Sequence, residues 1–342
     1  MFTPKRVTTL PAIRLSGLVL ISSIFLAALA LVWAGSSARA QQQPPPPPPT
    51  QKPQERPDDY RIRRDVNLVV LHATVLDDRG RFVPDLREDN FRVYEDKVEQ
   101  KLALFKREDV PVSVGLVIDN SGSMRDKRDR VNAAALTFVR TSNPQDEAFI
   151  VNFNDDYYLD LDKDFTSDIS EMREALERVD SRGSTALYDA VIGSLDHLKK
   201  GHRDKKVLLV ITDGEDNASR KSLPVTVQEA QKTDTLIYAV GLLSQESKSS
   251  AKRARRALVE LTQATGGLAF FPESAQDAES ICTQIAHDIR NQYTLAYYPT
   301  NAAKDGTFRA VHVDVIPPRG RSRLTVRTRN GYYAQRAAAA GN

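Results

Sequence analysis

The chain has 342 residues, enough for one large domain or for one large and one small domain. Its formal charge is +3, but residues 1–40 hold four basic and no acidic residues, so the remainder has a formal charge of −1. A near-neutral protein has no general electrostatic attraction to nucleic acid or to anionic lipid, and we expect no nucleic-acid partner. The one cysteine, Cys282, excludes an intrachain disulfide, so a hydrophobic core must stabilise the fold.

The first forty residues have the pattern of an export signal. Basic residues precede an apolar run at 18–35, and Ala38-Arg39-Ala40 forms a small-x-small cleavage site. We predict a signal peptide over 1–40, with export through the Sec route to the periplasm, the cell envelope or the medium. The apolar run is nearly long enough to cross a bilayer, so an uncleaved membrane anchor is the alternative.

Residues 41–64 form a Pro-rich linker. Six consecutive prolines at 44–49 favour a stiff polyproline II spacer of roughly 19 Å. Such a run can also be a peptide ligand, but after an export signal a stalk is the better interpretation.

The next segment, 65–108, contains short strand-like runs separated by turns such as Asp78-Arg79-Gly80. Residues 295–335 look the same, and 336–342 form a tail. Each β segment is too small to close a core alone, so we expect the two to pair as one small antiparallel β-sandwich. Arginines alternate along the second segment, at 319, 321, 323, 327 and 329, and we expect most of them to face solvent or a partner.

Between the β segments, residues 109–294 alternate apolar strands with amphipathic helices. The strand VSVGLVID at 112–119 precedes a predicted helix over 125–141, and Ser167 is predicted to cap another helix. Unbroken apolar strands alternating with helices indicate a mostly parallel sheet that is covered on both faces. The predicted fold class is therefore α/β, a doubly wound, mostly parallel sheet inserted in the small β-sandwich.

Oxygen-bearing side chains gather in three segments of this central region. Asp119, Ser121 and Ser123 follow the first strand, Thr185 opens a helix, and Asp213 ends the strand LLVITD. Sites in such sheets form beyond the carboxyl ends of the strands. Carboxylates and hydroxyls without thiol or imidazole select Mg²⁺ or Mn²⁺, with Ca²⁺ less favoured, over zinc or copper.

The sequence DNSGS at 119–123 resembles the D-x-S-x-S motif of the von Willebrand factor A (VWA) domain, and Thr185 and Asp213 stand in the family's third and fourth places. The resemblance covers roughly 109–294 and implies a complete metal-ion-dependent adhesion site (MIDAS). In the family the hydroxyls bind the metal, the aspartates act largely through water, and a partner's acidic side chain completes the coordination. The export signal, the linker, the flanking β segments and the ending RNGYYA also resemble exported acidobacterial VWA-domain proteins.

The resemblance implies an exported adhesion-type module, and not an enzyme, that binds a protein partner offering an Asp or Glu carboxylate. A rim of Asn154, Asp155, Glu215 and Asp216 is expected to influence ligand specificity. One alternative is a structural component of an envelope assembly in which the metal only stabilises loops. A hydrolase is a distant alternative, because the sequence lacks a Gly-x-Ser-x-Gly elbow and its histidines are scattered.

Overall fold

The computed structural model describes residues 68–107, 109–141, 143–178, 181–321 and 323–336. The predicted signal peptide and Pro-rich linker lie outside these residues. Within the described ranges, no helix combines the length and the apolar character needed to span a membrane.

The central part of the chain is built on a six-stranded sheet with the strand order β10-β9-β8-β5-β6-β7. All neighbouring strands pair in parallel except β7, which runs antiparallel to β6. The strands are β5 (Val112–Asp119), β6 (Glu147–Phe153), β7 (Tyr157–Leu159), β8 (Lys205–Thr212), β9 (Leu236–Gly241) and β10 (Ala269–Phe270). The chain passes from β5 to β6 on one side and later returns to β8 on the other, so β5 marks the switch point where sites form in such sheets.

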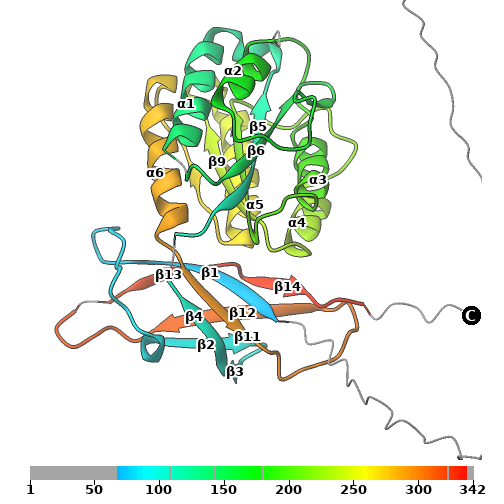
Figure 1. Ribbon diagram of the computed structural model, residues 1–342. Coiled ribbons are helices and arrows are strands. Elements are labelled where there is room, and N and C mark those ends of the chain that lie inside the picture. The colour runs from blue at the N-terminus through cyan, green and yellow to red at the C-terminus, as the bar shows by residue number, and fades with distance from the viewer. Residues whose placement is uncertain (1–67, 108, 142, 179–180, 322, 337–342) are drawn as a thin grey trace, which may run out of the picture. The chain divides into compact units, whose positions relative to one another are not determined.

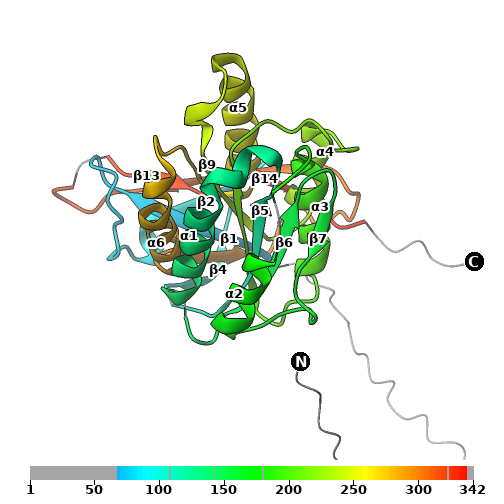
Figure 2. The same ribbon diagram turned by 90° about the horizontal axis from the view of Figure 1, so that it is seen from above.

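Helices cover both faces of this sheet, as predicted. One face carries α1 (Arg128–Arg140), α2 (Ile169–Glu177) and α6 (Ala278–Arg290), and the other carries α3 (Leu187–Leu198), α4 (Leu223–Gln231) and α5 (Lys248–Thr265). Figures 1 and 2 show α1 and α6 on one side of β5 and β6, and α3 on the other.

Two helix predictions need correction at their starts. The segment 122–127 is a 3₁₀ helix, so the α-helix predicted over 125–141 begins only at Arg128. Asp168, not Ser167, caps α2, because the Asp168 carboxylate accepts a hydrogen bond from the Ser170 amide at 2.7 Å. The Ser167 hydroxyl instead donates to the carbonyl of Asp146. Further 3₁₀ turns span Glu88–Asn90, Leu243–Gln245 and Ala275–Asp277.

The hydrophobic core explains why β5 is apolar from Val114 to Ile118. Leu116 and Ile118 pack in one cluster with Phe138 of α1, whereas Val117 packs in a second cluster with Val191 of α3. Because both faces of the strand are buried, alternation with polar residues would place polar groups in a core. Ser113, near the start of the strand, donates its hydroxyl to Glu147 at 2.7 Å, and the next polar side chain is Asp119 at the carboxyl end.

The N- and C-terminal β segments form two four-stranded antiparallel sheets with the orders β13-β1-β11-β4 and β14-β12-β2-β3. Their shared core includes Leu71, Val93, Leu295 and Val313. The strands are β1 (Val69–Leu76), β2 (Phe91–Glu95), β3 (Val98–Gln100), β4 (Leu102–Lys106), β11 (Tyr293–Tyr297), β12 (Phe308–Val315), β13 (Thr325–Arg327) and β14 (Gly331–Tyr333). The predicted pairing of the two chain segments into one small β unit is confirmed.

The two crossings between the β-sandwich and the α/β part lie at the same end of the parallel sheet. One runs from the end of β4 to the start of β5, and the other from the end of α6 to the start of β11. The sandwich therefore adjoins the edge at which the parallel strands begin. The carboxyl ends of β5 and β8 lie at the opposite edge, away from these crossings.

Two arginines predicted to face solvent instead join the sandwich to the α/β part. Arg329 is 8% exposed and donates to the carboxylate of Asp234 at 2.7 Å, while Arg327 pairs with Asp288 of α6. Arg321, on the preceding turn, does lie at the surface, where it pairs with Asp85. The solvent-facing prediction is therefore wrong for Arg327 and Arg329.

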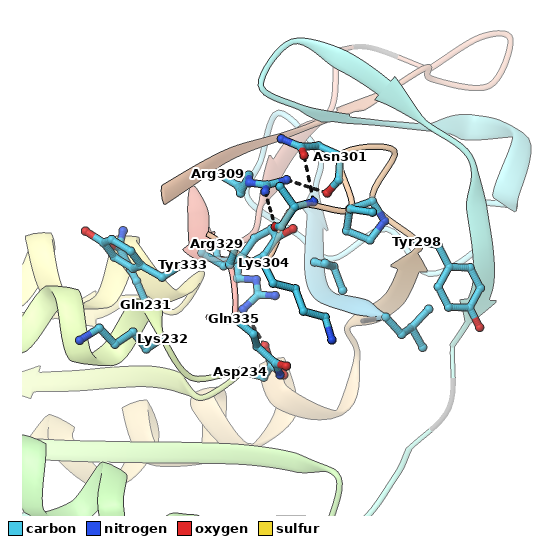
Figure 3. A pocket seen from close by; sticks show the side chains of 17 residues that line it. Gln231, Lys232, Asp234, Tyr298, Asn301, Lys304, Arg309, Arg329, Tyr333 and Gln335 are labelled. Carbon is cyan, nitrogen blue, oxygen red and sulfur yellow. Dashed lines mark hydrogen bonds and ion pairs between the residues drawn. The ribbon is translucent and has the colours of Figure 1, made fainter. Parts of the chain in front are cut away.

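A cavity of about 400 Å³ lies beside this contact and is shown in Figure 3. Arg309 lines it and donates to the carbonyls of Asn301 and Ala303, each at 2.8 Å, and to Glu95 at 3.1 Å. Since Arg309 pairs with Glu95 and Arg329 with Asp234, each buried guanidinium is balanced by an acid of the fold. Of the two pairs, Arg329–Asp234 joins the two parts of the chain, and Arg309–Glu95 lies within the sandwich.

Candidate metal-binding site

Asp119 is the last residue of β5 and is fully buried. One carboxylate oxygen accepts a hydrogen bond from the Ser121 amide at 2.8 Å, and the other accepts one from the Thr212 hydroxyl at 2.5 Å. Burial raises the pKa of Asp119 to about 6, and the hydrogen bonds oppose that rise only in part. The hydrogen bonds from Ser121, just after β5, and from Thr212, at the end of β8, therefore fix the orientation of the Asp119 carboxylate.

Ser121 and Ser123 connect Asp119 to Asp213. The two serine hydroxyl oxygens lie 3.1 Å apart, and Ser123 donates to an oxygen of Asp213 at 2.8 Å. Asp213 directly follows β8, which pairs with β5. Four of the five predicted ligands thus form one continuous group at the carboxyl ends of two adjacent strands.

Thr185 reaches the same edge on the loop before α3. The Gly183 carbonyl accepts from the Gly122 amide at 3.1 Å, and the Arg182 amide donates to the Asn120 carbonyl at 2.9 Å. Thr185 is buried, and its amide donates to the side chain of Asn217 at 2.8 Å. Hydrogen bonds therefore join the loop of Thr185 to those of Ser121 and Asp213.

Gly183 is required in this loop for two reasons. Its φ is +75°, in the left-handed region, and a Cβ built on it would lie 2.2 Å from an oxygen of Asp155. Asp155 itself accepts a hydrogen bond from the Ser184 amide at 2.9 Å. A larger residue at 183 would displace the loop that carries Thr185.

The predicted rim residues all lie on the loops of this edge and hold those loops together. The Asn154 carbonyl accepts from the Ala186 amide at 2.7 Å. Glu215 pairs with Arg253 of α5 at 2.6 Å. Asp216 accepts from the Tyr188 amide at 3.0 Å, at the start of α3.

Two basic residues at this edge were not anticipated from the sequence. Lys127 pairs with the carboxylate of Asp213. Arg128 donates to side-chain oxygens of Asn120 and Asn152 and to the Leu176 carbonyl. The only signal in the sequence is their position in the first turn after DNSGS, where a helix begins to turn its side chains back towards the preceding loop.

The donor set fits a hard divalent cation. Three hydroxyls and two carboxylates offer oxygen only, and Mg²⁺ and Mn²⁺ are bound by such ligands together with water. Across the described ranges there is no group of three or more His, Cys, Asp or Glu side chains that could hold a metal. The candidate site has only two carboxylates, so the serine and threonine hydroxyls are essential to its fit.

No histidine of the described chain forms a hydrogen bond with Ser121 or Ser123. Three of the five make contacts elsewhere with a carbonyl or an acid: His197 with Asp164, His202 with Glu147 and His312 with Asp314. His72 contacts Thr294, and His287 contacts Asn291. Among the described residues, the hydrogen-bond partner of the Ser123 hydroxyl is therefore the Asp213 carboxylate and not an imidazole.

Residues 114–215 match the family model of the von Willebrand factor type A domain. This range includes β5, α1, α3 and β8 and all five predicted metal ligands. This part of the chain is thus similar to the VWA domain. A search among curated proteins found no match.

Several solved structures resemble the chain. A von Willebrand factor type A protein from Catenulispora acidiphila has 11% identity and a TM-score of 0.48, covering 79% of this chain and 73% of its own. The PilB minor pilin from Streptococcus sanguinis has 11% identity and a TM-score of 0.44, covering 54% of this chain and 63% of the pilin. Proximal thread matrix protein 1 from the mussel byssus, with a zinc-occupied MIDAS motif, has 16% identity and a TM-score of 0.46, covering 57% of this chain and 49% of its own. The chain thus spans less than two thirds of the pilin and of the byssus protein.

Proposed function

We propose that this protein is an exported binding module that holds a protein partner through a divalent metal ion and an acidic side chain of the partner. The observation that carries the proposal is the convergence of three separate segments at one edge of the sheet. They bring Asp119, Ser121, Ser123, Thr185 and Asp213 to that edge. The match of this region to the VWA domain supports the same function.

The geometry suggests a division of roles among the five residues. The hydroxyls of Ser121, Ser123 and Thr185 would hold Mg²⁺ or Mn²⁺ directly, with Ca²⁺ less favoured. Both oxygens of Asp119 already accept a hydrogen bond, which favours action through water. A bound ion would supply a Lewis-acidic centre for a carboxylate oxygen of the partner.

We further propose that the protein is exported through the predicted signal peptide over 1–40 and that it is not an enzyme. The signal pattern supports the first statement. The lack of a histidine partner at either serine, among the described residues, supports the second. The rim of Asn154, Asp155, Glu215 and Asp216 would influence the choice of partner by setting the positions of the loops around the ion.

Calorimetric titration of Mg²⁺ and Mn²⁺ into the purified protein tests the proposal. We expect saturable one-site binding that Asp119→Ala abolishes. The matched control is Asp126→Ala, which removes an exposed acid from the 3₁₀ helix that follows Asp119 and should leave binding unchanged. Equal binding by wild type and Asp119→Ala would contradict the proposal.

A structural role in an envelope assembly is the second candidate, and a feature of the sandwich favours it. Large apolar side chains of this part are exposed, namely Val98, Tyr298, Phe308 and Ile316. In this case the sandwich would make the contacts and the metal would only stabilise loops. Partner capture that persists in Asp119→Ala with the fold intact would favour assembly over adhesion.

A further inference from the structure

The strongest unassigned feature of the site is the ammonium group of Lys127. Its side chain is 10% exposed, and it pairs with a carboxylate oxygen of Asp213, whose side chain is fully buried. The same nitrogen lies 3.5 Å from the Ser123 carbonyl. A nearly buried positive charge therefore lies against the residues to which the proposed function assigns the metal.

This contact changes the charge balance of the site. The two aspartates alone would neutralise a divalent cation, but Lys127 returns one positive charge to the group. With the ion bound, Asp119, Asp213 and Lys127 leave a formal charge of +1.

We propose that Lys127 makes the site depend on an anionic ligand, by weakening the binding of the metal alone and by favouring the metal together with a carboxylate. The inference rests on the proposed function and adds that the metal and the partner's acid bind cooperatively. One carboxylate brings the formal charge of the group to zero. A neutral hydroxyl or amide in the same place leaves it at +1, so the partner's ligand is an Asp or Glu.

The electrostatic effect is large enough to measure. Lys127 contacts the Asp213 carboxylate, and the ion would act on the same carboxylate directly or through one water, so their charges would lie within several ångström of each other. Even with the dielectric constant of water, removing one charge at such a distance from a divalent ion changes the affinity at least about tenfold. Partial burial makes the effect larger, because water screens the two charges less.

The test measures the affinity for Mg²⁺ by calorimetric titration. It compares wild type, Lys127→Met and Lys127→Arg, each without acetate and with acetate as the carboxylate probe. Chloride at the same ionic strength is the control for salt. We expect Lys127→Met to bind Mg²⁺ alone at least about tenfold more tightly and to lose the gain in affinity that acetate gives the wild type. Lys127→Arg keeps the charge and should remain close to the wild type in both measurements.

Asp119→Ala, measured alongside, separates the two proposals. If it abolishes Mg²⁺ binding while Lys127→Met binds no more tightly than the wild type, the role of Lys127 is refuted and the metal site stands. If wild type, Asp119→Ala and Lys127→Met all fail to bind Mg²⁺ and Mn²⁺, both proposals are wrong. Circular dichroism of each variant establishes that it is folded, and Lys127→Gln provides a second neutral variant if Lys127→Met is not.

Discussion

Replacing Lys205 by Met should stabilise the protein at neutral pH. Lys205 begins β8, is 5% exposed, and donates a hydrogen bond to the Ile289 carbonyl near the end of α6 at 2.5 Å. Burial lowers the pKa of this lysine from about 10.5 to about 7, although Asp288, Asp109 and Asp146 oppose the shift. The folded protein therefore holds the charged form of Lys205 at a cost.

The size of this cost follows from the shift in pKa. A change from about 10.5 to about 7 corresponds to roughly 5 kcal/mol at about 1.4 kcal/mol per unit. Methionine would remove this cost but leave the Ile289 carbonyl without its donor, which costs about 1–3 kcal/mol. We therefore expect Lys205→Met to be more stable than the wild type by about 2–4 kcal/mol at pH 7.

The pH dependence gives a sharper test than the single value. Between pH 7 and about 10.5 the unfolded wild-type chain binds more protons at this lysine than the folded chain does, so wild-type stability rises with pH in this window. The advantage of Lys205→Met should then shrink by up to about 1.4 kcal/mol per pH unit. Below pH 7 both states of the wild type are protonated and the advantage should stay constant.

Urea unfolding followed by far-UV circular dichroism at pH 6, 7, 8 and 9 measures these differences. Lys206→Met is the matched control, because it removes the same charge from the next residue of β8, where the side chain is only half-buried. An advantage that does not change with pH, or a loss of stability at pH 7, would refute the reasoning.

Two further predictions concern a loop and a thiol. Gly183→Ala should destabilise the protein by more than about 1 kcal/mol and weaken Mg²⁺ binding, as calorimetry and urea unfolding would reveal. Gly320→Ala, also at a positive φ but with no atom within 4 Å of the added Cβ, should leave Mg²⁺ binding unchanged, and equal effects of the two variants on the metal would contradict this view of the loop. Cys282 is buried in the core, and burial raises the pKa of its thiol to about 12, so it should react with a chromogenic disulfide reagent only after unfolding. Rapid reaction of the native protein would show that the Cys282 thiol of α6 is accessible to solvent in the folded state.

The α/β architecture was predictable because it depends on local patterns. Each core strand is recognisable as a short run of apolar residues, and each helix as apolar residues at a helical spacing. Both patterns can be identified without knowing the rest of the chain. The convergence of Asp119, Ser121, Ser123 and Asp213 was predictable for a related reason: parallel strands end at a common edge, so residues that follow β5 and β8 must meet. Helix starts were less certain, since Ser167 and Asp168 are both good caps and only the fold decides between them.

The misplaced basic residues show the limit of this reasoning. Lys127 and Asp213 are 86 residues apart, and Arg329 and Asp234 are 95 apart. In a sequence, an arginine or lysine on an amphipathic element indicates a solvated face. Its burial depends on a distant acid that no local pattern identifies. The prediction therefore failed for Arg327 and Arg329, and the place of Lys127 was not predicted, because each charge is neutralised by a long-range partner.

The way in which the α/β part is inserted has a consequence for how the chain folds. β4 and β11 are neighbours in one sheet of the sandwich, with Lys106 opposite Thr294, yet the whole α/β part lies between them in the sequence. Pairing these strands in an unfolded chain would require closing a very long loop, at a high cost in chain entropy. Once the inserted part has folded, its two ends already lie at one edge of its sheet, and the same pairing becomes a short-range event. We therefore expect the sandwich to be completed late, when the second β segment arrives after the α/β part has folded.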